Sequence, residues 1–254
     1  MFDFNNRTAV ITGAAGGIGR ALAHKFCANK VAVAVTDICK AGVEKLVEEL
    51  LEGGGKVRGY PMDVTSTESV NQAAKCILAD FPRIDILVNN AGVWNHPNGK
   101  LNSFADTPES YWKWILDVNL LGTFRVTQAF LKPMLEQQYG RIINLGSIAG
   151  EVGLPGHCDY AAAKAGVIMM TKTLAMEVAR QNITVNCVSP GMVAGNDTKT
   201  NPTSGTWIGR TGTPSEIADL ILFLASDQTA FITGVDYTID GGRILGPKAC
   251  EFTL

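Results

Sequence analysis

Charged side chains are scarce in this sequence. Asp, Glu, Lys and Arg make up 18% of its 254 residues, against about 25% in ordinary soluble domains. The formal net charge is −2 and no block of basic residues occurs, so the chain has no general attraction for nucleic acid or an anionic membrane surface, and we expect neither as a partner. Because 46% of the residues are apolar, we expect other subunits to cover part of the surface and predict a homotetramer.

Several familiar signals are missing as well. The six cysteines, at positions 27, 39, 76, 158, 187 and 250, form no C-x-x-C pair, which predicts reduced, mostly buried thiols and a cytoplasmic location. The first residues hold no signal-peptide core, and no apolar run reaches the roughly 18 residues of a membrane span. The three histidines, at 24, 96 and 157, are scattered and no H-E-x-x-H motif occurs, so no metal site is predicted.

The sequence does contain a regular alternation of short apolar segments and longer helical ones. Strands are predicted at 8–11, 31–35, 57–60, 84–88, 141–147, 183–188 and 235–242 with its turn, separated mostly by helices. This alternation predicts one α/β domain over residues 1–254, a Rossmann-type doubly wound parallel sheet of about seven strands. A polar loop at 192–210 is expected to contact substrate, and residues 243–254 form a tail.

A glycine-rich segment follows the first strand. It reads Thr12-Gly13-Ala14-Ala15-Gly16-Gly17-Ile18-Gly19 and leads into a helix predicted at 20–28. Glycines let backbone amides approach a pyrophosphate at a helix N-terminus, although such a cluster can also be a tight turn. Asp37 ends the second strand, where it could accept hydrogen bonds from a ribose or cap the helix predicted at 40–51.

Tyr160 and Lys164 are four residues apart on a predicted helix, and therefore lie on one face. An ammonium about 4 Å from a phenol can stabilise the phenolate by about 4 kcal/mol, so Lys164 could lower the pKa of Tyr160 toward neutrality. The spacing alone is also that of an ordinary helix face. Ser147 stands thirteen residues upstream, at the end of a buried strand.

Together these motifs resemble the short-chain dehydrogenase/reductase family. The spacing Thr-Gly-x-x-x-Gly-x-Gly, the segment Asn89-Asn90-Ala91-Gly92 and the turn Ser189-Pro190-Gly191 fit its pattern. The resemblance implies that Asn119, Ser147, Tyr160 and Lys164 are catalytic. It implies coenzyme contacts from Gly13, Gly17, Ile18, Gly19, Asp37, Asp63, Val64, Asn90, Tyr160, Lys164, Gly191 and Val193. One departure is Gly195, which replaces a usual Thr and leaves Thr198 as the nearest substitute.

The resemblance implies an oxidoreductase that transfers a hydride between a nicotinamide coenzyme and a secondary alcohol or ketone. A 3-oxoacyl-thioester reductase and a non-catalytic NAD-binding protein are the alternatives. A serine hydrolase is not favoured, because Ser147 stands one position too early for the G-x-S-x-G motif. Trp94, His96, Glu151, His157 and Trp207 are candidates for the substrate pocket.

NAD is the predicted coenzyme. The carboxylate of Asp37 would repel the 2′-phosphate of NADP, and the neighbouring positions hold Ala14, Ala15, Ile38 and Cys39 rather than a cation.

Overall fold

The computed structural model describes residues 4, 6–96, 99, 103–195, 197, 200–203 and 205–246. Seven parallel strands form one sheet in the order β3-β2-β1-β4-β5-β6-β7, which confirms the predicted fold class. The strands are β1 (Thr8–Thr12), β2 (Ala32–Asp37), β3 (Val57–Pro61), β4 (Ile86–Asn89), β5 (Gly140–Leu145), β6 (Ile183–Pro190) and β7 (Asp236–Ile239).

Helices connect the strands. They are α1 (Gly17–Ala28), α2 (Lys40–Glu52), α3 (Thr67–Asp80), α4 (Glu109–Leu116), α5 (Gly122–Gln137), α6 (Ala149–Val152), α7 (Cys158–Val178) and α8 (Pro214–Ala225), with short turns η1 (Asp117–Leu121), η2 (Ala179–Gln181) and η3 (Asp227–Thr229). The long helix predicted at 108–134 is α4 and α5 joined through η1, which is a π-helical turn. The short helix α6 occupies a segment that was predicted to be a loop.

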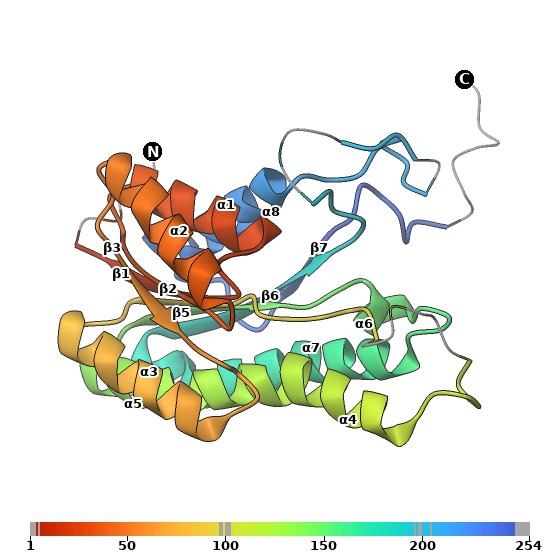
Figure 1. Ribbon diagram of the computed structural model, residues 1–254, viewed down its shortest axis with the longest axis horizontal. Coiled ribbons are helices and arrows are strands. Elements are labelled where there is room, and N and C mark those ends of the chain that lie inside the picture. Colours follow the sequence, from red (N-terminus) through yellow and green to blue (C-terminus); the bar gives the residue numbers. More distant parts are fainter. Residues whose placement is uncertain are drawn as a thin grey trace.

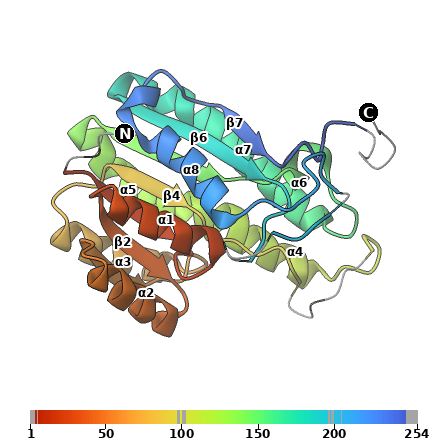
Figure 2. The ribbon, with the colours of Figure 1, turned by 90° about the horizontal axis from the view of Figure 1, so that it is seen from above.

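The helices cover both faces of the sheet. Helices α1, α2 and α8 lie on one face, and α3, α5 and α7 lie on the other (Figures 1 and 2). Successive strand residues enter the two cores in turn, as Ile11 and Val33 do on the first face and Val10 and Ala34 on the second. Strands buried on both faces must be apolar throughout, and this is why the sequence pattern predicts them so clearly.

The order of the strands in the sheet indicates where a ligand binds. Strand β1 is paired with β2 on one side and with β4 on the other, so the order of the strands reverses there. Ligands of such sheets bind at the carboxyl ends of the strands beside this reversal. Helix α4, helix α6 and the segment after β6 gather toward one end of the molecule (Figure 1).

Sequence-coded caps fix where two helices begin. The Ser66 hydroxyl accepts from Ser69 N at the start of α3. At α8, Thr213 and Glu216 form the reciprocal capping box that the sequence predicts. The hydrogen bond from Arg210 is the main reason that the pKa of Glu216 falls to about 2.

The thiols differ from the prediction. The five described cysteines are free, but Cys39, Cys76 and Cys158 are exposed and only Cys187 is fully buried. The expectation of mostly buried thiols is therefore wrong, because these side chains lie on the outer faces of α3 and α7 and before α2. Position 250 lies outside the described residues. Within the described part of the chain, no helix is long and apolar enough to cross a membrane.

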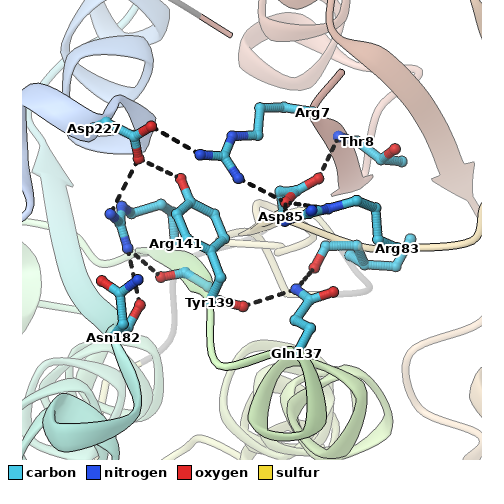
Figure 3. A network of polar contacts seen from close by, with 11 residues as sticks. Arg7, Thr8, Arg83, Asp85, Gln137, Tyr139, Arg141, Asn182 and Asp227 are labelled. Carbon is cyan, nitrogen blue, oxygen red and sulfur yellow. Dashed lines mark hydrogen bonds and ion pairs between the residues drawn. The ribbon is translucent and has the colours of Figure 1, made fainter. Parts of the chain in front are cut away.

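The amino edge of the sheet carries a cluster of paired charges (Figure 3). The fully buried Asp85 accepts hydrogen bonds from Thr8 N at 2.9 Å, from Arg7 Nη1 at 3.1 Å and from Arg83 Nε at 2.8 Å. Asp227 accepts from Arg7, from Arg141 and from the Tyr139 hydroxyl. The guanidinium groups of Arg7 and Arg141 also lie over the Tyr139 ring, at 3.9 and 4.4 Å from its centroid. These contacts tie the first residues of three strands to η3.

Candidate active site

The glycine segment after β1 packs tightly against the end of β4. Asn90 Nδ2 donates to the carbonyl oxygens of Thr12 and Gly13, at 2.9 Å each. Gly13 has a φ of +61°, and a Cβ there would lie 2.8 Å from the Cα of Ala91. A Cβ on Gly19 would overlap the Gly13 carbonyl. These glycines and Asn90 therefore hold the loop in place.

The start of α1 fits an anionic ligand. The helix begins at Gly17 without a side-chain cap, and its first turn contains no acidic residue. A Cβ on Gly16 would meet nothing within 4 Å, while the half-buried Ile18 side chain packs into the core. Backbone N–H groups at an uncapped helix N-terminus favour a pyrophosphate, so these residues fit a dinucleotide coenzyme.

Asp37 stands at the carboxyl end of β2, directly beside that loop. Its Oδ2 accepts from Ala15 N at 3.1 Å and its Oδ1 from Cys39 N at 2.9 Å. Lys40, the nearest cation in sequence, is paired with Glu44 at 3.8 Å. The carboxylate is thus held by backbone amides while keeping acceptor capacity for ribose hydroxyls.

Asp63 and Val64 follow β3. Asp63 Oδ1 accepts from the backbone N and the hydroxyl of Thr65, at 2.9 and 2.7 Å, so Asp63 orders a turn rather than capping α3. The Val64 carbonyl accepts from Arg125 at 3.2 Å. Both residues lie near the ends of the first strands, where an adenine contact stays a prediction.

Ser147, Tyr160 and Lys164 come together where β5 ends and α7 begins. Ser147 lies close enough to the Tyr160 hydroxyl to favour its ionised form, and its Oγ accepts from Ala149 N at 3.1 Å. Lys164 is buried, and its Nζ donates to the Leu145 carbonyl at 2.7 Å and lies 5.7 Å from the Tyr160 ring centroid. The predicted trio is therefore one connected group.

The electrostatics of this group differ from the prediction. Burial raises the pKa of Tyr160 above its ordinary value, and the neighbouring Ser147 hydroxyl only partly opposes this rise. Burial also lowers the pKa of Lys164 to about 8. The expected lowering of the Tyr160 pKa by Lys164 is wrong for these side chains alone, because the ammonium is directed to the Leu145 carbonyl and desolvation of the phenolate dominates.

Asn119 lies in the π-helical turn η1. Its Nδ2 donates to the carbonyl oxygens of Val93 and Ile115, at 2.8 and 3.0 Å, and its Oδ1 accepts from Val93 N. A Cβ on Gly92 would lie 2.8 Å from Asn119 Oδ1 and 3.5 Å from Lys164 Nζ. The space beside Gly92 thus borders both predicted polar groups, and π-helical turns are frequent at functional sites.

The turn after β6 carries Gly191 and Val193. Gly191 N donates to the Ile239 carbonyl at 3.0 Å, and a Cβ on Gly191 would lie 2.6 Å from the Asp240 Cβ. Val193 forms an isolated bridge with Gly212. Packing against the residue after β7 is therefore sufficient to require glycine at 191. The nicotinamide contact expected for this turn stays a prediction. Thr198 lies outside the described residues.

The candidate pocket residues separate into two sets. Trp94, His96 and His157 cluster beside Tyr160: the His157 ring stacks on Trp94 with 5.4 Å between centroids and meets Tyr160 edge-on at 6.5 Å.

The other two candidates lie elsewhere. Glu151 bonds the Thr238 hydroxyl at 2.8 Å, and Trp207 donates to the Leu245 carbonyl at 3.3 Å. Sequence reasoning missed Asp159, whose Oδ1 accepts from Tyr160 N while Oδ2 pairs with His96 Nε2 at 2.9 Å. Its place next to Tyr160 was the available signal.

The fold and this site define an oxidoreductase that binds a nicotinamide dinucleotide. A family model described as enoyl-(acyl carrier protein) reductase matches residues 13–243. With the relatives below, this match shows that the chain belongs to the short-chain dehydrogenase/reductase family.

Individual relatives match almost the whole chain. The 3-oxoacyl-(acyl-carrier-protein) reductase of Thermotoga maritima is 39% identical over 94% of this chain and 98% of its own length. Nodulation protein G of a Rhizobium species is 37% identical over 95% and 98%, and the Vibrio cholerae 3-oxoacyl-(acyl-carrier-protein) reductase is 37% identical over 96% and 99%. A crystal structure of gox2181 superposes with a TM-score of 0.88 at 34% identity, covering 96% of this chain and 97% of that one.

Proposed function

We propose that this protein reduces the ketone of a 3-oxoacyl thioester to a secondary alcohol. The relatives named as 3-oxoacyl-(acyl-carrier-protein) reductases support this substrate class, since they match 94 to 96% of the chain. The observation that carries the direction is the half-buried Tyr160, whose hydroxyl lies beside Ser147 and whose pKa is raised by desolvation. A phenol that stays protonated at neutral pH is suited to donate a proton.

In this proposal each residue has one role. The Ser147 hydroxyl holds the substrate oxygen, and the Tyr160 hydroxyl gives its proton to that oxygen as the carbonyl is reduced. Lys164 and Asn119 border the space beside Gly92, through which the proton of Tyr160 is replaced. The coenzyme, when bound, supplies the hydride. One hydride and one proton together convert the ketone to the alcohol.

The test is a spectrophotometric assay at neutral pH. Purified protein is mixed with reduced coenzyme and the acetoacetyl thioester of N-acetylcysteamine, and coenzyme absorbance is followed. We expect a steady decrease that depends on the thioester. No decrease with this thioester or with simple ketones would favour the non-catalytic alternative.

Reduction of a small hydroxy ketone, or oxidation of the matching alcohol, is a second candidate. The aromatic and histidine side chains of Trp94, His96 and His157 beside Tyr160 favour it, because they combine apolar faces with polar ring nitrogens. It uses the same Ser147 and Tyr160 chemistry, so a panel of carbonyl compounds separates the two candidates.

We also propose NAD(H) as the coenzyme, supported by the Asp37 carboxylate at the end of β2. A like-charge contact with the 2′-phosphate that costs about 3 kcal/mol gives a preference of about 100-fold. We expect NADH to exceed NADPH by at least about tenfold in kcat/KM. Asp37→Ser should shrink this gap mainly by improving NADPH, and equal efficiency of both coenzymes in the wild type would contradict the proposal.

A homotetramer in the cytoplasm remains our proposal for the assembly. An apolar groove of about 710 Å³ lies between α5 and α7. Phe124 of α5 and Met169 of α7 line it and are 45 and 60% exposed. Met176, also on α7, is 77% exposed. Val167 of α7 is buried within the chain and contributes nothing to this surface. Light scattering at micromolar concentration tests this proposal, and a monomer would contradict it.

A further inference from the structure

His157 occupies a fixed place beside the catalytic phenol. It is the N-cap residue of α7, three positions before Tyr160, and is 3% exposed. Trp94 stacks on its ring at an interplanar angle of 17°, while the Tyr160 ring meets it at 71°. The imidazole is therefore held between the 93–96 segment and the residue that exchanges the proton.

The two ring nitrogens of His157 have different surroundings. Nδ1 lies 3.4 Å from the Pro155 carbonyl, which can only accept a hydrogen bond, so this contact favours the tautomer with the proton on Nδ1. Nε2 then carries a lone pair. Among the residues that the structure describes, no group forms a hydrogen bond with Nε2. Buried acceptors without a partner are rare in native proteins, and a functional role or a bound group is among the explanations for them.

The neighbouring histidine, His96, is hydrogen-bonded within the chain. His96 Nε2 is bonded to Asp159 Oδ2 at 2.9 Å, and both side chains are buried. Asp159 Oδ1 in turn accepts from Tyr160 N at 2.8 Å. This pair holds the 93–96 segment on the first turn of α7. Of the two histidines beside Tyr160, His157 is thus the one with an acceptor atom left for a ligand.

We propose that Nε2 of His157 accepts a hydrogen bond from a hydroxyl group on the carbon next to the reacting carbonyl. His157 is then a specificity-determining residue that selects a 2-hydroxy ketone over a plain ketone. The inference rests on the second candidate of the proposed function, reduction of a small hydroxy ketone at Tyr160, and names the feature that its substrate must carry. The ketone of a 3-oxoacyl thioester has no hydroxyl on either neighbouring carbon. A site built to bond a hydroxyl discriminates strongly against an analogue without it, because its own buried polar atom is then left unpaired.

Hydroxyacetone and butanone form a matched pair for the test, since a methyl group replaces the hydroxyl. We expect the wild type to prefer hydroxyacetone in kcat/KM by at least about tenfold. His157→Phe keeps a ring to stack on Trp94 but removes Nε2, together with the long Nδ1 contact to the Pro155 carbonyl. It should bring the ratio close to one by lowering kcat/KM for hydroxyacetone while leaving butanone within about threefold. His157→Gln, which restores an acceptor, should recover part of the preference.

Several outcomes would overturn the inference. Equal rates with the two ketones in the wild type would overturn it alone, as would an equal loss for both ketones in His157→Phe, which is the result of a merely structural role. A wild type that reduces the thioester but not hydroxyacetone would overturn the inference and leave the 3-oxoacyl proposal standing. One that reduces none of these compounds would overturn the proposed function as well.

Thermal unfolding gives an independent measurement. Since Nε2 has no partner in the described fold and the Nδ1 contact to Pro155 is long at 3.4 Å, His157→Phe should keep its Tm within a few degrees. A fall of more than about 5 °C would mean that the imidazole serves the fold and would overturn the assignment.

Discussion

The two edges of the sheet hold buried polar groups in opposite ways. At the amino edge, three residues donate to the buried Asp85 and three to the exposed Asp227, with Arg7 donating to both, so the two charges are matched within the chain (Figure 3). At the carboxyl edge, Lys164 is buried with a carbonyl as its hydrogen-bond partner, and the half-buried Tyr160 lies beside a histidine with an unbonded nitrogen in the described fold.

This difference separates stability from chemistry. Removing one partner of a buried, fully paired charge strongly destabilises the folded state. Groups whose polar atoms are incompletely paired can still bind a ligand or exchange protons. The first edge should therefore tolerate little change without unfolding. The second should lose activity, and can even gain stability, when its polar groups are removed.

The largest expected effect is that of Tyr160→Phe on turnover. Loss of the hydroxyl removes the proton donor, so kcat should fall by about 10²–10⁴-fold while the free energy of unfolding changes little. Steady-state kinetics and urea unfolding measure the two quantities. The same change at the other edge, Tyr139→Phe, is the matched control: it removes the bond to Asp227 and should lower stability without affecting kcat. Near-normal turnover in Tyr160→Phe would refute its assigned role.

At the amino edge, Asp85→Ala should lower the free energy of unfolding by about 3–5 kcal/mol, since it leaves Arg7 and Arg83 without their buried partner. The kcat of the folded protein should be unchanged. Asp219→Ala, which breaks the more exposed pair with Lys25, is the control and should cost less than about 1 kcal/mol. Similar losses of unfolding free energy in the two variants would contradict the prediction that the buried ion pairs stabilise the fold more than the exposed one.

Lys164→Met should act in the opposite direction on stability. The folded-state pKa of Lys164 is about 8 against an ordinary 10.5, so the charged form is destabilised by roughly 3 kcal/mol below pH 8. After subtracting about 1 kcal/mol for the lost bond to Leu145, the variant should be more stable by about 1–2 kcal/mol at pH 7, but inactive.

The pH dependence gives this prediction a second arm. Between pH 8 and 10.5 the unfolded wild type binds more protons at Lys164 than the folded protein does. Its stability contribution therefore rises with pH through that window. The rise should be absent in Lys164→Met, and parallel stability curves for the two proteins would contradict the assigned pKa direction.

Much of the fold was predictable because its signals are local. Apolar runs such as Thr8–Ile11, the glycine segment after them and the capping residues Thr213 and Glu216 lie within a few positions of one another. The joining of Ser147 to Tyr160 was predictable from their places at a strand end and on the next long helix, together with the family resemblance.

The unpredicted features depend on contacts between distant positions or on burial. Arg7 is 78 residues from Asp85 and 220 from Asp227, and no local pattern connects them. The direction of the Tyr160 pKa was wrong for the second reason, since the spacing to Lys164 does not reveal how deeply the phenol is buried. Asp159 was overlooked because its partner, His96, comes from another loop.

The π-helical turn η1 also lets the chain carry one more residue without disturbing the helix that follows. An α-helix advances about 100° per residue, and the wider turn takes up about one extra residue. Helix α5 therefore keeps the rotational phase that places Phe130 and Met134 in the core. A deletion of one residue within 117–121 should close the turn into an ordinary α-helical one and leave the apolar stripe of α5 on the sheet, while Asn119 loses the position that the wider turn gives it. The extra residue thus serves Asn119 without a loss of packing in α5.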